Sequence, residues 1–100
     1  PTVKAPWRER KEEYIAHLQG VSPDVILVSC ADKLHNARSL WTDIQRDGVG
    51  TIERFNAPGA EIAWHYSALL AAFELRGAPE DLLIPLREVV LNLSTALDDL

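Results

Sequence analysis

Four polar residues with chemically useful side chains follow a long apolar segment in the first half of the chain. After the mostly apolar positions 25–31 come Asp32, Lys33, His35 and Asn36. If this stretch is helical, Asp32 and Asn36 share a face because residues four apart lie one above the other, and His35 stands beside them. Carboxylates and imidazoles bind metals and exchange protons, whereas ammonium and amide groups bind phosphate oxygens.

Asp32 is the residue that most needs an explanation. The positions before it are apolar on all sides, which predicts a buried helix, and a buried carboxylate is costly unless it is paired, hydrogen-bonded or bound to a metal. Lys33 is an imperfect partner because neighbouring helical residues point about 100° apart. We therefore expect either a protein group from another helix or a bound metal or phosphate at this position.

The composition predicts one cytoplasmic domain, residues 1–100, with a modest core. The formal net charge of −5 argues against nucleic acid as a partner, because non-specific binding to it needs a basic surface. Cys30 is the only cysteine, which excludes an intrachain disulfide, and its apolar neighbours predict a buried, unreactive thiol. No signal peptide is recognisable, and no apolar run is long enough for a membrane span.

The spacing of apolar residues predicts an all-α fold, a small bundle of about five helices. After an extended lead-in over residues 1–5, helices are expected at 7–18, 22–46, 49–55, 60–75 and 79–99. Ser22 is the expected N-cap of the second helix, and Gly77 the stop of the fourth. Pro85 should kink or split the last helix, whose apolar residues have near-heptad spacing.

The segment from Asp32 to Arg38, Asp-Lys-Leu-His-Asn-Ala-Arg, resembles a segment of the HD-domain phosphohydrolases, in particular of the RelA/SpoT-type (p)ppGpp hydrolases. The resemblance extends back to Trp7–Lys11 and forward through Arg54-Phe55 and Trp64–Tyr66. It covers about residues 5–75, and the amphipathic helix 79–99 lies beyond it. The resemblance implies a fold similar to the C-terminal part of an HD domain.

The resemblance also implies a divalent metal, often Mn²⁺, that polarises a phosphoryl group and activates water for the hydrolysis of a nucleotide phosphate or pyrophosphate. Asp32 would then be a metal ligand and catalytic residue, and Asn36 would help to shape the substrate site. The candidates for contact with the substrate phosphates are Arg8, Arg10, Lys11 and Lys33. For the first three, the alternative is a solvated helix face that is paired with Glu9, Glu12 and Glu13.

The chain departs from the HD pattern in its histidines. The family is named for a His-Asp pair, but none of His17, His35 and His65 is followed by Asp. We therefore expect half of a metal site, which is inactive in a single chain, holds no metal by itself and is completed only by a missing or partner half. A homo-oligomer or a partner chain is expected. The alternative is a non-catalytic module for oligomerisation or for binding a ligand or partner.

The aromatic residues and two of the histidines are assigned simpler roles. Trp64 and Tyr66 are expected to pack in the core or in an interface before they serve as a platform for a nucleobase. His17 and His65 are expected to be structural or solvated, because a lone histidine on an amphipathic helix usually is.

Overall fold

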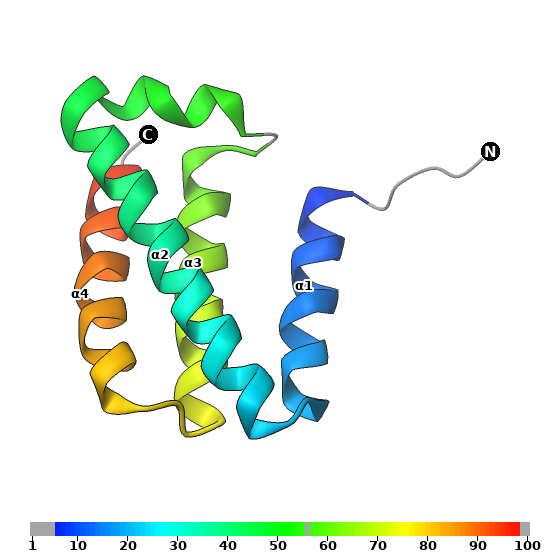
Figure 1. Ribbon diagram of the computed structural model, residues 1–100. Helices are drawn as coiled ribbons and strands as arrows, with labels where there is room; N and C mark the ends of the chain where they lie inside the picture. The colour runs from blue at the N-terminus through cyan, green and yellow to red at the C-terminus, as the bar shows by residue number, and fades with distance from the viewer. Residues whose placement is uncertain (1–5, 56, 99–100) are drawn as a thin grey trace.

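The protein, represented by a computed structural model, is an all-α bundle in its described residues, 6–55 and 57–98 (Figure 1). Its elements are α1 (Trp7–His17), η1 (Leu18–Gly20), α2 (Pro23–Asp47), η2 (Val49–Arg54), α3 (Gly59–Leu75) and α4 (Glu80–Leu97), where η denotes a 3₁₀ helix. The predicted bundle of about five helices is confirmed, with η2 in place of the helix expected at 49–55. The expected lead-in 1–5, Asn56 and residues 99–100 lie outside the described residues.

The ends of α2 follow from its capping residues. The Ser22 hydroxyl accepts a hydrogen bond from the backbone N–H of Val25 at 3.3 Å, and Pro23 occupies the first turn. At the other end, Gly48 has a φ of 85°, a left-handed conformation that glycine adopts at little cost. The predicted start and stop of this helix are therefore confirmed.

The connection from α3 to α4 is a tight glycine turn. Gly77 has a φ of 70°, its N–H donates to the carbonyl of Glu74 at 3.1 Å, and the N–H of Ala78 donates to the carbonyl of Phe73 at 3.0 Å. α4 then continues unbroken through Pro85, so the predicted split at this residue is wrong. The proline removes one backbone hydrogen bond, and burial of apolar residues on both sides of it keeps the helix intact.

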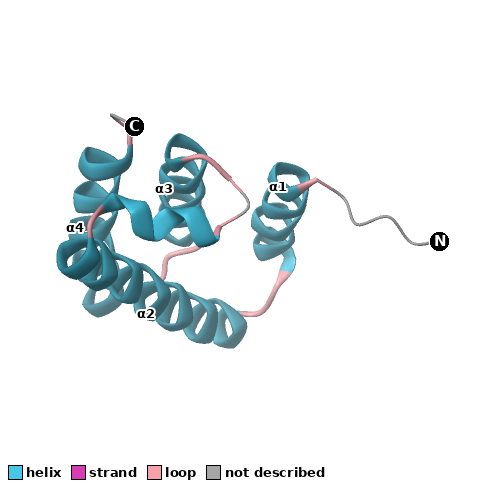
Figure 2. Ribbon diagram, turned by 90° about the horizontal axis from the view of Figure 1, so that it is seen from above, coloured by secondary structure: helices cyan, strands magenta, loops and turns pink. Residues whose placement is uncertain are grey.

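The core lies between α2, α3 and α4. α3 and α4 run side by side, and α2 crosses them obliquely (Figures 1 and 2). α4 contributes the near-heptad face that the sequence predicts, with Leu86, Leu93 and Leu97 fully buried. Phe73 of α3 and Leu40 of α2 are also almost fully buried. Cys30 has no exposed surface, and burial raises the pKa of its thiol, as expected for an unreactive cysteine.

α1 stands apart from these three helices (Figure 2). None of its eleven residues, all of which are described, is buried. At its end, Leu18 is buried and the guanidinium of Arg76, just after α3, donates to the carbonyls of Leu18 and Val21. Along the helix, the partly buried side chains of Trp7, Tyr14 and Ile15 pack against the core. α1 is therefore a separate wall beside the bundle and carries its side chains toward α2 and α3.

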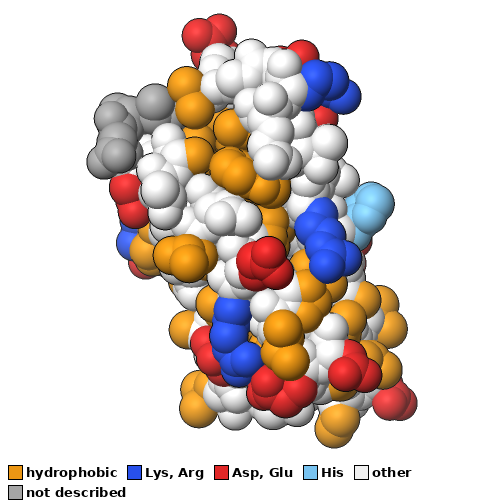
Figure 3. All heavy atoms as spheres, turned by 90° about the vertical axis from the view of Figure 1, so that its left-hand side faces the viewer, with side chains coloured by type: hydrophobic (Ala, Val, Ile, Leu, Met, Phe, Trp, Pro, Cys, Tyr) orange, Lys and Arg blue, Asp and Glu red, His pale blue; other side chains and the backbone are white. Residues whose placement is uncertain are grey.

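The outer face of the first half of α2 is apolar and exposed. Val25, Leu27 and Val28 are 44%, 46% and 69% exposed. The prediction that this stretch is buried all round is therefore wrong, because one face alone of α2 packs on the neighbouring helices. Apolar side chains also reach the surface between charged ones on the side drawn in Figure 3. None of the helices in the described part of the chain combines the length and apolar composition needed to cross a bilayer.

Candidate functional site

A pocket of about 320 Å³ lies between the separate helix α1 and the bundle. Its walls come from α1, α2, η2 and α3, which are far apart in the sequence. This volume is at the lower end of the range found for small-molecule sites. The pocket is therefore large enough for the charged end of a ligand together with part of its body.

The charged groups of the pocket are all basic. Lys11 comes from α1, Lys33 from α2 and Arg54 from η2. Among the described residues that line the pocket, none is acidic. Three cations from three separate elements thus face one cavity of a chain whose formal net charge is −5, and such a cavity attracts anions by its local field.

The two lysines are held at the pocket by neighbouring rings. The Nζ of Lys33 lies 4.9 Å from the ring centre of Tyr14, and that of Lys11 lies 5.6 Å from the ring centre of Trp7. The side chain of Lys33 is only 22% exposed. Burial, and then the charges of Lys33 and Arg10, lower the pKa of Lys11. An anion that entered the pocket would relieve this repulsion.

The rest of the lining combines hydrogen-bonding groups with apolar surface. Asn36 and Ser39, from α2, offer an amide and a hydroxyl. The apolar and aromatic lining residues are Trp7, Leu40, Phe55, Ile62 and Tyr66. Such a mixture suits a ligand with an anionic end and a flat or apolar body.

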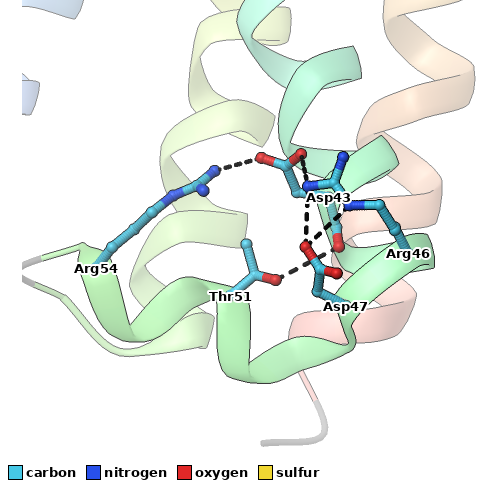
Figure 4. Close-up of polar contacts among 5 residues, drawn as sticks. All are labelled: Asp43, Arg46, Asp47, Thr51 and Arg54. Atoms are coloured by element: carbon cyan, nitrogen blue, oxygen red, sulfur yellow. Dashed lines mark hydrogen bonds and ion pairs between the residues drawn. The ribbon is translucent and has the colours of Figure 1, made fainter.

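η2 is fixed against α2 by an ion pair (Figure 4). A guanidinium nitrogen of Arg54 lies 2.6 Å from a carboxylate oxygen of Asp43, and the Thr51 hydroxyl donates to the backbone carbonyl of Asp43 at 3.4 Å. Arg46 also binds Asp43, at 3.1 Å. The hydrogen bond from Arg54, together with the two positive charges, holds the pKa of Asp43 below its usual value. These contacts position Arg54 at the edge of the pocket.

Arg8 joins α1 to α3. Its guanidinium lies 2.6 Å from a carboxylate oxygen of Glu61 and 3.4 Å from the ring centre of Trp64. Trp7 adds edge contacts to the rings of Trp64 and His65, with ring centres 6.5 Å and 5.8 Å apart. Arg8 therefore has partners within the protein and lies outside the pocket lining.

His65 is the buried polar side chain of the pocket. It is 9% exposed, and among the described residues its Nδ1 is the one buried side-chain nitrogen or oxygen without a hydrogen-bond partner. Burial, and then the charges of Lys11 and Lys33, lower its pKa to about 4. The imidazole is therefore neutral at pH 7. Its neighbour Tyr66 is also buried, and burial followed by the charge of Asp32 raises the pKa of its hydroxyl.

Asp32 does not occupy the buried position that the sequence suggests. Its side chain is 58% exposed, and its carboxylate lies 3.4 Å from the Nζ of Lys33. The expectation that it requires a partner from another helix or a metal is therefore wrong, because water and Lys33 together satisfy it. In the described ranges, no three His, Cys, Asp or Glu side chains come close enough together to hold a metal ion. This donor set does not fit the divalent metal that the resemblance implies.

The pocket brings together part of the predicted site. Lys11, Lys33 and Asn36 line it, whereas Asp32, Arg8 and Arg10 are not among its lining residues. The sequence reasoning missed Arg54 and His65 as site residues. Arg54 belongs to one of the segments that resemble the HD family, so the resemblance could have indicated it. The sequence around His65 contains no pattern that marks it as a site residue.

No protein-family model matches this chain, and no curated protein sequence is significantly similar to it.

Proposed function

We propose that the chain is a nucleotide-phosphate-binding domain related to the HD phosphohydrolases, and that its basic pocket receives the phosphate groups. The observation that carries this proposal is the convergence of Lys11, Lys33 and Arg54 from three elements on one cavity without an acidic lining residue. Asn36, which the resemblance assigns to the substrate site, lines the same cavity. The aromatic walls leave room for contact with the sugar or base.

The proposal is one of binding rather than of turnover in a single chain. Asp32 is exposed and paired with Lys33, and it has no cluster of further donors in the described residues. A catalytic Mn²⁺ at Asp32 would therefore need donors from another chain or segment, as the resemblance to half of an HD domain implies. Binding in the basic pocket does not depend on that completion.

Calorimetric titration at about pH 8, where His65 is neutral, tests the proposal. Guanosine diphosphate and inorganic pyrophosphate should bind, and guanosine should bind much more weakly. Lys11→Met and Lys33→Met should each lower the affinity about tenfold, because each removes a charged contact. Arg10→Met is the matched control, since Arg10 is the neighbour of Lys11 on the same helix, is exposed and does not line the pocket.

Two results would contradict the proposal. One is the absence of binding by either phosphate compound. The other is an equal loss of affinity in Arg10→Met and Lys11→Met, which would mean that general charge on α1, and not the pocket, attracts the ligand.

We also propose that the chain self-associates through the exposed apolar face of α2. The support is the exposure of Val25 and Val28, two apolar side chains that lie three residues apart and therefore share a face of α2. Val28→Glu should shift the protein toward monomer in sedimentation equilibrium. Leu91→Glu, at a similarly exposed position on α4, should not. Equal sedimentation of the wild-type protein and Val28→Glu would contradict self-association through this face.

A further inference from the structure

The starting observation is the position of His65. It lines the basic pocket, more than nine-tenths of its surface is buried, and no protein group in the described residues bonds its Nδ1. An imidazolium carries two N–H donors, so a protonated His65 would have a buried donor without an acceptor. The free protein thus disfavours the charged form both by desolvation and by the lack of an acceptor.

The charges around His65 act in the same direction. On the walls packed against it, the titratable groups are Lys11 from α1, Lys33 from α2, Arg54 from η2 and Tyr66 from α3 itself. Of these cations, Lys33 pairs with Asp32 at 3.4 Å and Arg54 with Asp43 at 2.6 Å, and Glu61 pairs with Arg8. In the free protein, a proton on His65 would therefore add a positive charge beside Lys11 and Lys33, whose charges already oppose it.

An anion in the pocket reverses the electrostatic effect, because it neutralises the field of the lysines. We propose that the binding of a doubly charged anion, such as a phosphate monoester, is coupled to the uptake of one proton by His65. This inference rests on the proposed binding of phosphate in the same pocket. An anion that keeps both charges, such as sulfate, would then bind more tightly as the pH falls below neutrality, whereas a phosphate monoester takes up a proton of its own at about pH 6.

Sulfate is the appropriate probe, because it remains doubly charged over the pH range in which imidazole titrates and so adds no titration of its own. The imidazole C–H signals of the wild-type protein are followed by NMR as a function of pH, with sulfate or with chloride at equal ionic strength. Sulfate should raise the pKa of His65 from about 4 by about one unit or more. The controls are internal, since His17 and His35 are exposed and lie outside the pocket lining, so sulfate should change their signals no more than chloride does.

The same samples distinguish the possible failures. Backbone amide shifts at Lys11 and Lys33 report whether sulfate enters the pocket. If these amides shift and the pKa of His65 does not, the proton coupling is overturned and phosphate binding stands. If sulfate leaves the amides unchanged, the coupling is also overturned, and the calorimetric titration with pyrophosphate then decides the proposed function separately.

A variant provides a second measurement. In the wild-type protein, the sulfate affinity should rise about twofold as the pH is lowered from 7 to 5 if the pKa of His65 rises from about 4 by one unit on binding, and more if the pKa rises further. In His65→Phe, which keeps a ring of similar size but cannot bind a proton, this pH dependence should disappear. A pH dependence of equal size in the variant would overturn the proposal.

Discussion

The two sides of α2 lie in contrasting surroundings. One side packs on α3 and α4, where leucines and Phe73 are fully buried. The other side faces α1 and η2 across a pocket that contains three cations and an unpartnered histidine. α1 contributes no buried residue of its own. One long helix thus serves as the centre of a close-packed core and as one wall of a polar cavity.

This contrast suggests that the α2–α3–α4 side provides most of the stability, whereas the side that faces α1 forms the proposed binding pocket. Close packing makes the α2–α3–α4 side intolerant of change in volume. On the α1 side, the like charges and the buried unpaired nitrogen lower stability, and the proposed anion would offset the repulsion between the charges. The predictions below test whether the two sides differ in this way.

The largest effect is expected in the core. Phe73→Ala removes a fully buried ring and should lower the free energy of unfolding by about 3–5 kcal/mol, because it leaves a cavity. Phe55→Ala removes a half-buried ring from the pocket wall and should cost about 1 kcal/mol. Urea denaturation measures both. Equal losses would mean that the pocket side is packed as tightly as the core.

Acid should weaken the protein through His65. Its pKa is about 4 in the folded protein and near 6.5 in the unfolded chain, so the unfolded chain binds the extra proton between these values. Stability is therefore complete above pH 6.5 and is lost as the pH falls toward 4, by at most about 3 kcal/mol.

Urea denaturation in chloride buffers at several pH values measures this contribution. In His65→Phe it should be absent, and in His17→Phe, where an exposed histidine is replaced, it should remain. An unchanged acid slope in His65→Phe would show that His65 binds its proton equally well in the folded and unfolded states.

A smaller effect is expected where α1 joins the bundle. Arg76→Leu leaves two backbone carbonyls, those of Leu18 and Val21, without their donor and should cost about 1–2 kcal/mol. The matched control is Arg87→Leu, because Arg87 pairs with the exposed carboxylates of Glu74 and Glu80. Such surface ion pairs contribute little to the free energy of unfolding, so Arg87→Leu is expected to cause no measurable loss of stability. If Arg87→Leu lowers the free energy of unfolding as much as Arg76→Leu does, the hydrogen bonds from Arg76 to the end of α1 contribute no more to stability than a surface ion pair.

The smallest effect concerns the pocket wall η2. Asp43→Asn weakens the ion pair that positions Arg54 and should lower pyrophosphate affinity about threefold, since Arg54 then samples more orientations. Asp24→Asn, at the far end of the same helix, is the control. Calorimetric titration compares the two variants. An affinity in Asp43→Asn equal to that of the control would mean that Arg54 needs no support to bind the ligand.

The fold could be predicted because its signals are local. The Ser22 hydroxyl can cap a helix start, Gly48 can adopt the positive φ at a helix end, and the spacing of Leu86, Leu93 and Leu97 marks one face of α4. The effect of Pro85 on the last helix was overestimated, because burial of the apolar residues around it outweighs one lost backbone hydrogen bond.

The site could be predicted in part. Lys11, Lys33 and Asn36 emerged from the family resemblance, and the structure places all three on the pocket. The apolar residues before Asp32 suggest burial, but they are divided between two faces of α2. Ile26 and Cys30 are buried, whereas Asp32 lies on the exposed side with Val28. The role of His65 depends on helix packing that brings α1 and α2 lysines beside it, which no local pattern in the sequence could show.

Amide chemical-shift mapping with inorganic pyrophosphate tests the central claim most directly, because it locates the bound anion. The account predicts that the largest shifts occur around Lys11, Lys33, Asn36, Arg54 and His65, from four separate elements, and saturate together. Largest shifts on the opposite side of the molecule, at α4, or the absence of saturable shifts would contradict the claim that this pocket binds phosphate.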